Sequence, residues 1–230
     1  MTLNAAKTEN SVLLTSTKMT LEHLGGVMSD AALTGQEIFR AGTKDRGTPT
    51  IFLDLDGTLH CGHAAMDEDG RIFLDTGRPL FEFAPLLIEL LEPYPDVVIV
   101  LTTSWLMTLS AGQVTARLPF ALGRRVVGTT RHIKPRLSHI LNGSDRTYVI
   151  CCYAYGASLT RWLAIDDSVY GVAGFGSHFG ELSDHFLLLD SSFGISAPSA
   201  LSRIGEWLTE SHAEQGAASG IEHASQRNAP

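Results

Sequence analysis

The chain has 230 residues, 44% of them hydrophobic, enough for the core of one domain of roughly 150 residues with tails. Its formal net charge of −8 argues against binding nucleic acid or anionic membranes through bulk charge. The three cysteines form no Cys-x-x-Cys pair, and the first residues do not resemble a signal peptide, so we expect a cytoplasmic protein. No apolar stretch approaches the ~18 residues of a membrane span, and we expect no membrane contact.

Strand and helix patterns alternate between residues 50 and 208. Short apolar runs predict strands at residues 50–54, 97–101, 125–128, 162–165 and 186–189. Helical spacing or composition predicts helices around residues 81–91, 112–118, 146–155 and 198–208. Residues 60–80 are rich in Gly and Asp and predict a hairpin flap around residues 71–74. This order predicts an α/β fold with a doubly wound, mainly parallel sheet and helices on both faces.

The two ends of the chain differ from this middle part. Residues 1–48 are polar and weakly patterned, and we expect a poorly ordered N-terminal extension, with a short helix near residues 19–39 as the alternative. Residues 49–210 should form the α/β domain. Residues 211–230 are rich in Ser, Ala, Gly, Gln and His, which predicts a disordered tail.

The end of the first predicted strand carries two carboxylates, Asp54 and Asp56. Residues i and i+2 of a strand point to the same side, and open α/β sheets place their ligands at the carboxyl edge. Gly57 allows a sharp turn with positive φ, and the Thr58 hydroxyl with nearby backbone N–H groups can hold a phosphate. This segment therefore supplies a nucleophile, a proton donor and half of a metal site.

The segment Asp54-Leu55-Asp56-Gly57-Thr58-Leu59 resembles the signature of the haloacid dehalogenase (HAD) superfamily. Two alternatives are an ordinary Asp-x-Asp surface turn and a calcium loop, but the acidic ligand that a calcium loop needs at a later position is missing. The resemblance implies that residues 49–210 form a HAD-like hydrolase domain. It also implies Asp54 as nucleophile and Asp56 as general acid and base.

The strand at residues 97–101 ends in Thr102-Thr103-Ser104-Trp105. This resembles the second HAD motif, a Ser or Thr that binds a phosphoryl oxygen. We favour Thr102 for this role and keep Thr103 as the alternative if the register differs by one. With Ile165-Asp166-Asp167, the run Thr103-Ser104-Trp105 is similar to the HAD domain of bacterial Swiss-Army-knife RNA-repair proteins, although those relatives often have Arg where this chain has Leu106.

The strand at residues 162–165 ends in the adjacent acids Asp166 and Asp167. Neighbouring carboxylates repel each other unless a cation offsets their charge. The pair resembles the fourth HAD motif, which implies an Mg²⁺ ion held by Asp54, Asp167 and the Asp56 carbonyl, with Asp166 close by. Carboxylate and carbonyl oxygens are the ligands that Mg²⁺ prefers.

The third HAD motif is a basic residue, and two residues qualify. Arg146 lies twenty residues before Asp166 and opens a predicted helix, whereas Lys134 lies 32 residues before it in a Lys-Pro pair of a kind common at this motif. We favour Arg146 and leave Lys134 open.

These motifs together predict an Mg²⁺-dependent phosphatase that acts through an aspartyl-phosphate. Its substrate would be a phosphorylated small molecule or macromolecular end; nucleic acid stays open, although the net charge does not indicate it. The alternatives are a nucleic-acid end phosphatase in RNA or DNA repair, and a non-catalytic phosphate-binding module. His60, Cys61 and His63 suggest zinc, but no second cluster accompanies them, and we expect a flap or substrate contact instead. The gaps between the motifs are too short for a large cap domain.

Overall fold

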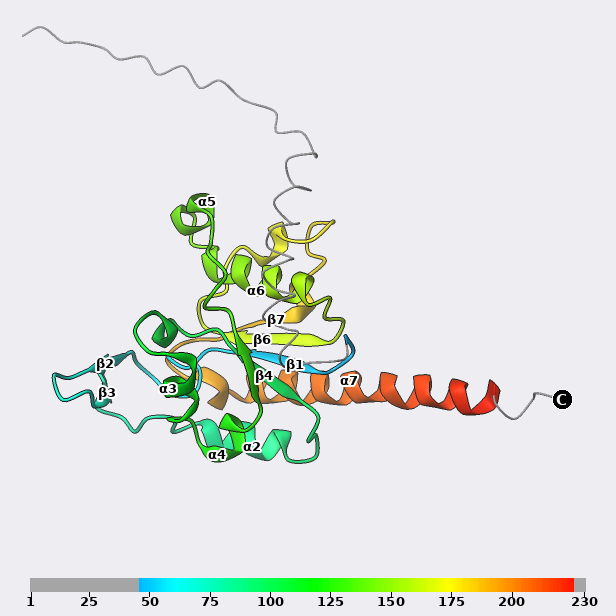
Figure 1. Cartoon of the computed structure of the whole chain (residues 1–230), viewed down its shortest axis with the longest axis horizontal. Helices are drawn as coiled ribbons and strands as arrows, with labels where there is room; N and C mark the ends of the chain where they lie inside the picture. Colours follow the sequence, from blue (N-terminus) through cyan, green and yellow to red (C-terminus); the bar gives the residue numbers. More distant parts are fainter. Residues whose placement is uncertain (1–45, 226–230) are drawn as a thin grey trace, which may run out of the picture.

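A computed structural model of the chain describes residues 46–225, with side chains described up to residue 213. Its centre is a sheet of five parallel strands in the order β5-β4-β1-β6-β7 (Figure 1). In chain order these are β1 (Thr50–Leu53), β4 (Val98–Leu101), β5 (Val126–Thr129), β6 (Trp162–Asp166) and β7 (Phe186–Leu188). The chain starts in the middle of the sheet, moves to one edge and then crosses to the other, as in a doubly wound fold.

Helices cover both faces of this sheet. Helices α2 (Ala84–Leu91) and α7 (Pro198–Ser225) lie on one face, and α6 (Asp145–Gly156) lies on the other (Figure 1). Shorter elements connect the strands: η1 (Ser104–Met107), α3 (Ala111–Thr115), α4 (Phe120–Gly123), α5 (Leu137–Leu141), η2 (Val172–Gly174), η3 (Ser183–His185) and η4 (Gly194–Ser196). The predicted fold class is therefore confirmed.

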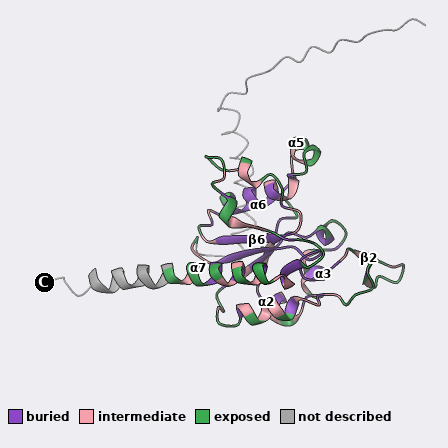
Figure 2. Ribbon diagram, turned by 180° about the vertical axis from the view of Figure 1, so that it is seen from behind, coloured by how far each residue is buried: buried purple, intermediate pink, exposed green. Residues whose placement is uncertain are grey.

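The side chains of β1 show why its sequence is apolar throughout. Ile51 and Leu53 belong to the core cluster under α2 and α7, whereas Phe52 belongs to the cluster under α6. Phe52 packs edge-on against Tyr153 and Trp162, with ring centroids 5.5 Å away in each case. A strand buried on both faces needs apolar residues at every position, and Figure 2 shows the buried residues concentrated in these strands.

The register of the sheet aligns the ends of its three central strands. Leu53 of β1 pairs with Leu101 of β4 and with Ile165 of β6. One residue further along, Asp54, Thr102 and Asp166 therefore form a row along the carboxyl edge.

The segments between the motifs form no separate lid within the described residues. Strands β2 (Ala64–Met66) and β3 (Ile72–Leu74) pair as the predicted antiparallel hairpin and project away from the sheet (Figure 1). In the segment between β4 and β5, Val114, Leu118 and Leu122 pack into the core shared with α2 and α7. Neither segment builds a core of its own, in keeping with the expected absence of a large cap.

The end of the chain differs from our expectation. We expected the last helix to end near residue 208 and residues 211–230 to be disordered, but α7 continues to Ser225. Two contacts hold its fourth turn: Arg161 donates to the Ser211 carbonyl at 2.6 Å, and His212 Nε2 lies 2.9 Å from Asp96. The helix therefore ends later than residue 208, and disorder of residues 211–230 stays a prediction. None of the helices in the described part is both long and apolar enough to cross a membrane.

Residues 1–45 of the expected N-terminal extension lie outside the described residues, and so does the alternative helix near residues 19–39. Residues 226–230 of the expected tail also lie outside them.

Candidate active site

Three carboxylates meet at the carboxyl edge of the sheet. Asp54 follows β1, Asp166 ends β6, and Asp167 comes next in the chain. One oxygen from each of them lies within 4.8 Å of the others. We call Asp54, Asp166 and Asp167 the acidic cluster.

Arg146 joins this cluster from the first turn of α6. Its Nη1 lies 3.7 Å from Asp54 Oδ1, and its Nε lies 3.6 Å from Asp166 Oδ2. Nη1 also donates to Thr102 Oγ1 at 3.3 Å, so one guanidinium reaches the ends of β1, β4 and β6. Burial opposes its charge, but Asp54 and Asp166 outweigh burial and raise the pKa of Arg146.

The acidic cluster is not neutralised by this one cation. Burial, and then the charge of Asp166, raise the pKa of Asp54 well above its usual range, and the same two causes raise the pKa of Asp167. Burial also raises the pKa of Asp166. Asp54 Oδ1 and Asp166 Oδ2 are buried and have no hydrogen-bond partner among the described residues. These two oxygens face the Arg146 guanidinium at 3.7 and 3.6 Å, and one oxygen from each of the three carboxylates lies within 4.8 Å of the others. Such an all-oxygen set fits a hard divalent cation.

Gly57 makes the approach of these segments feasible. Its φ is +65°, and a Cβ at this position would collide with the Asp167 carboxylate. Gly194, with φ +52°, similarly brings its backbone against the Thr58 carbonyl. The turn after β1 thus needs glycine for its backbone conformation and for the space that the acidic cluster occupies.

Asp56 has a different environment from the acidic cluster. Its Oδ1 accepts hydrogen bonds from Trp105 Nε1 at 2.8 Å, His60 Nε2 at 3.0 Å and the Ala64 backbone N–H at 3.3 Å. Burial would raise the pKa of Asp56, but the hydrogen bonds from His60, Trp105 and the Ala64 backbone outweigh it, and the pKa is lowered. We call His60, Ala64 and Trp105 the Asp56 clamp.

Sequence reasoning missed the clamp. We considered His60 only as a zinc ligand or as a flap or substrate contact, yet its side chain is fully buried and bonded to Asp56. Cys61 Sγ instead donates to the Ser192 carbonyl at 2.9 Å, and His63 is exposed beside Asp75. Within residues 46–213, neither histidine nor Cys61 joins a group of three metal-ligating side chains. The signal in the sequence that points to the clamp is a histidine four residues after Asp56. The structure shows that the segment around this histidine is buried throughout.

The remaining candidate residues lie around the same edge. Thr103 caps η1, because its hydroxyl accepts from the Trp105 backbone N–H at 3.4 Å. Thr58 is fully buried, and its hydroxyl has no hydrogen-bond partner among the described residues. Lys134 is exposed on the loop between β5 and α5, and the ion pairs of the acidic cluster are made by Arg146 instead.

Two cavities open beside these residues. The larger, of about 570 Å³, is lined by Thr102, Arg146, Arg131 and Lys134 together with apolar side chains such as Ile133. Its volume lies in the range of small-molecule sites. Basic residues thus line the cavity on the Arg146 side of Asp54. Arg125 is not among them: its guanidinium donates to the Leu91, Tyr94 and Val97 carbonyls.

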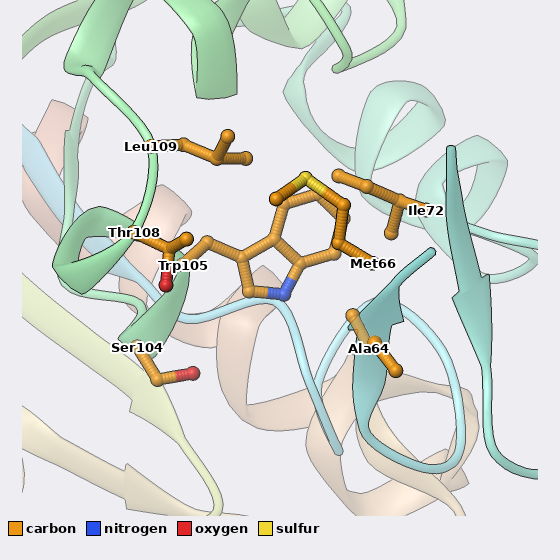
Figure 3. A pocket seen from close by; sticks show the side chains of 8 residues that line it. Ala64, Met66, Ile72, Ser104, Trp105, Thr108 and Leu109 are labelled. Atoms are coloured by element: carbon orange, nitrogen blue, oxygen red, sulfur yellow. The ribbon is translucent and has the colours of Figure 1, made fainter. Parts of the chain in front are cut away.

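The smaller cavity, of about 180 Å³, lies between the hairpin and η1. Figure 3 shows the Trp105 indole ring as its wall, with Met66 and Ile72 of the hairpin on one side and Leu109 on the other. Ser104 lines both cavities. Trp105 therefore contacts Asp56 through its nitrogen and lines the smaller cavity with its ring.

This sheet order, with an Asp-x-Asp-Gly-Thr turn after the central strand β1 and an acid pair at the end of β6, is that of a HAD-like α/β fold. The model of the family described as the HAD domain in Swiss Army Knife RNA repair proteins matches residues 50–200, and the chain belongs to this family. Searches among curated proteins and among solved structures gave no significant match. Membership confirms the resemblance seen in the sequence and supports a hydrolase of the phosphatase type.

Proposed function

We propose that the protein is an Mg²⁺-dependent phosphatase that forms an aspartyl-phosphate on Asp54. The observation that carries the proposal is that Asp54 meets Arg146 and the two other acids. One Asp54 oxygen is buried and has no hydrogen bond from any residue that the structure describes. An ionised carboxylate that faces both a fixed guanidinium and a metal-ligating pair is arranged to attack a bound phosphate.

The reaction has two steps. In the first, a carboxylate oxygen of Asp54 bonds to phosphorus, the bond to the leaving oxygen breaks, and Asp56 gives that oxygen a proton. In the second, Asp56 takes a proton from a water molecule, which attacks phosphorus and breaks the bond to Asp54. Inorganic phosphate leaves, and both carboxyl groups return to their starting states.

Donors at the strand ends stabilise the charge on the phosphoryl oxygens. We assign this role to Arg146 and Thr102, with Thr58 and the backbone around Gly57 on the other side and Thr103 as the alternative to Thr102. Lys134, which lines the larger cavity without joining the acidic cluster, is better suited to steer a substrate than to fill the third-motif position.

The metal would be held by Asp54, Asp166 and Asp167, with the Asp56 carbonyl as a further oxygen ligand. When bound, Mg²⁺ supplies positive charge against the carboxylates and the phosphoryl oxygens. This choice of ion rests on the all-oxygen set of ligands, because nitrogen and sulfur ligands would favour zinc.

A nucleic-acid end phosphatase is the second candidate. The family is described by its occurrence in RNA repair proteins, and the larger cavity is lined by Arg131 and Lys134. Residues 46–225 form no folded lid over the site, and such an open site also admits a phosphate at the end of a macromolecule.

The three cysteines are free, which fits the cytoplasmic location that we propose.

A phosphate-release assay tests this function. The panel holds an aryl phosphate, nucleoside monophosphates and oligonucleotides with 3′- or 5′-phosphates, each with Mg²⁺ and with a chelator. We expect release with Mg²⁺ only, and none from Asp54→Asn. Binding of phosphate without turnover on any member would support the non-catalytic module instead.

A further inference from the structure

Three N–H groups from separate parts of the chain converge on one oxygen of Asp56. His60 comes from the turn after β1, Ala64 from the hairpin and Trp105 from η1, and all three reach Oδ1. A carboxylate oxygen has two lone pairs in the plane of the group, so three donors leave Oδ1 no room to carry a proton. Proton exchange is then left to Oδ2.

The direction of the His60 bond follows from its second nitrogen. The Phe81 backbone N–H donates to His60 Nδ1 at 3.3 Å, so Nδ1 is an acceptor and the ring hydrogen is on Nε2, which faces Asp56. Phe81 itself has φ +58°, a conformation that is unfavourable for a residue with a bulky side chain. The N–H group that bonds to His60 thus comes from a residue with a strained backbone.

Aromatic packing fixes the rings that make up the clamp. His60 lies 5.5 Å from the Phe81 ring and 6.2 Å from the Trp105 ring, and Phe81 lies 5.7 Å from Trp105. A fully buried ring held in this way cannot follow Asp56 into another rotamer. The carboxylate is consequently held in a single orientation.

We propose that His60 and Trp105 are positioning residues which hold Asp56 so that only Oδ2 gives a proton to the leaving group. The inference rests on the proposed function, since it assigns the orientation of the same general acid. It predicts an effect that depends on the leaving group. An alkoxide needs a proton as the ester bond breaks, whereas a 4-nitrophenolate leaves readily without one.

The test compares kcat/KM of variants on two substrates with Mg²⁺ present: glycerol phosphate and 4-nitrophenyl phosphate. This parameter covers the steps up to departure of the leaving group, so it excludes the later attack of water. We expect Trp105→Phe and His60→Leu to lose on the order of 10²-fold on glycerol phosphate, within the range for general acid catalysis. On 4-nitrophenyl phosphate we expect a loss of less than about 10-fold, because the acid matters little there.

Matched variants separate positioning from general damage. His60→Gln keeps an N–H donor near the Nε2 position and should recover most of the activity on glycerol phosphate. Trp207→Phe removes a tryptophan that is equally buried, 6% exposed like Trp105, but lies in α7 away from the site, and should leave the ratio of the two substrates unchanged. Asp56→Asn shows the ratio expected when the acid is lost altogether.

Each outcome decides a separate claim. Equal losses on the two substrates, in variants whose thermal unfolding matches wild type, would assign His60 and Trp105 a purely structural role and overturn the inference. No loss would overturn it as well. If His60→Leu does not fold, the same comparison with Trp105→Phe decides. Failure of the wild-type protein to release phosphate from these two substrates and from every member of the panel above would instead reject the proposed phosphatase.

Discussion

Asp54 and Asp56 stand two residues apart on one turn, and their surroundings are opposite. Asp54 has a buried oxygen with no hydrogen bond within the described part of the chain, lies beside two further acids, and has a raised pKa. Asp56 receives three N–H groups on one oxygen and has a lowered pKa. The protein thus satisfies Asp56 with its own hydrogen-bond donors and leaves Asp54 short of positive charge. A bound cation can supply that charge.

The lowered pKa of Asp56 bears on its two roles. An ionised Asp56 is ready to act as the base toward water. To act as an acid it has to take up a proton when the negatively charged phosphate binds nearby, because a like charge raises the pKa of a carboxyl group.

The largest effect is expected on replacing Asp54, the carboxylate that lacks positive charge. Asp54→Asn should reduce turnover to background, because an amide cannot form the acyl phosphate, while the fold should persist since one repelling charge has been removed. Phosphate release and thermal unfolding of the same sample measure the two effects. Normal turnover in the folded variant would remove Asp54 from the mechanism.

The next largest effect is expected on the kcat of a variant that lacks Arg146, the cation that the protein itself places beside Asp54. Arg146→Ala should lower kcat by about 10²–10³-fold, as expected for loss of a donor to the transition state. Lys134→Ala is the matched comparison and should act more weakly, mainly through KM, because Lys134 lines the cavity without touching the acidic cluster. The reverse ranking in folded variants would move the third-motif role to Lys134.

The metal dependence should be smaller but specific to the acidic cluster. Asp167→Ala should raise the half-saturating Mg²⁺ concentration by about 10-fold or more. Even residues that only hydrogen-bond to metal ligands contribute about that much to metal affinity. Activity titrated with Mg²⁺ in chelator-treated protein gives the value. Asp75→Ala, which removes an exposed acid of the hairpin, is the control and should leave the titration unchanged. Activity that resists the chelator would require different chemistry at this site.

The smallest effect is expected on the pH dependence of the stability of the metal-free protein. Asp54, Asp166 and Asp167 have pKa values raised by folding, so the folded state binds more protons than the unfolded state between the ordinary and the raised values. Stability should therefore fall as pH rises through this window, which begins near the ordinary pKa of Asp.

Thermal unfolding measures this effect, with about 2–4 °C of Tm expected for each kcal/mol. Asp167→Asn should flatten the dependence, and Mg²⁺ at pH 7 should raise the Tm of wild type more than that of the variant. A metal-free Tm that increases with pH through the window would contradict the account of a repelling acidic cluster.

The strand ends could be predicted from the sequence for a simple reason. Asp54, Thr102 and Asp166 each follow a buried apolar run, and parallel strands bring such ends to one edge whatever the details of the loops. The preference for Arg146 over Lys134, based on spacing, agrees with the contacts of Arg146. The roles of these residues stay predictions until the variants are measured.

The Asp56 clamp could not be predicted in this way. His60, Ala64 and Trp105 reach Asp56 through turns whose paths depend on packing around Phe81, and no local pattern encodes those paths. Trp105 was noted only as part of a motif, with no partner for its indole N–H. The length of α7 escaped prediction for a similar reason, because contacts made by residues 211–212 with distant segments are not visible in composition.

The most direct test of the central claim is to trap the phosphorylated enzyme. Wild type and Asp56→Asn are mixed with Mg²⁺ and 4-nitrophenyl phosphate, quenched in acid within the first turnovers and analysed by peptide mass spectrometry. The account predicts one phosphate on Asp54, present in wild type, more abundant in Asp56→Asn because the base for water is missing, and absent from Asp54→Asn. Steady release of phosphate with no phosphorylated Asp54 in either protein, or with phosphate on another residue, would contradict it.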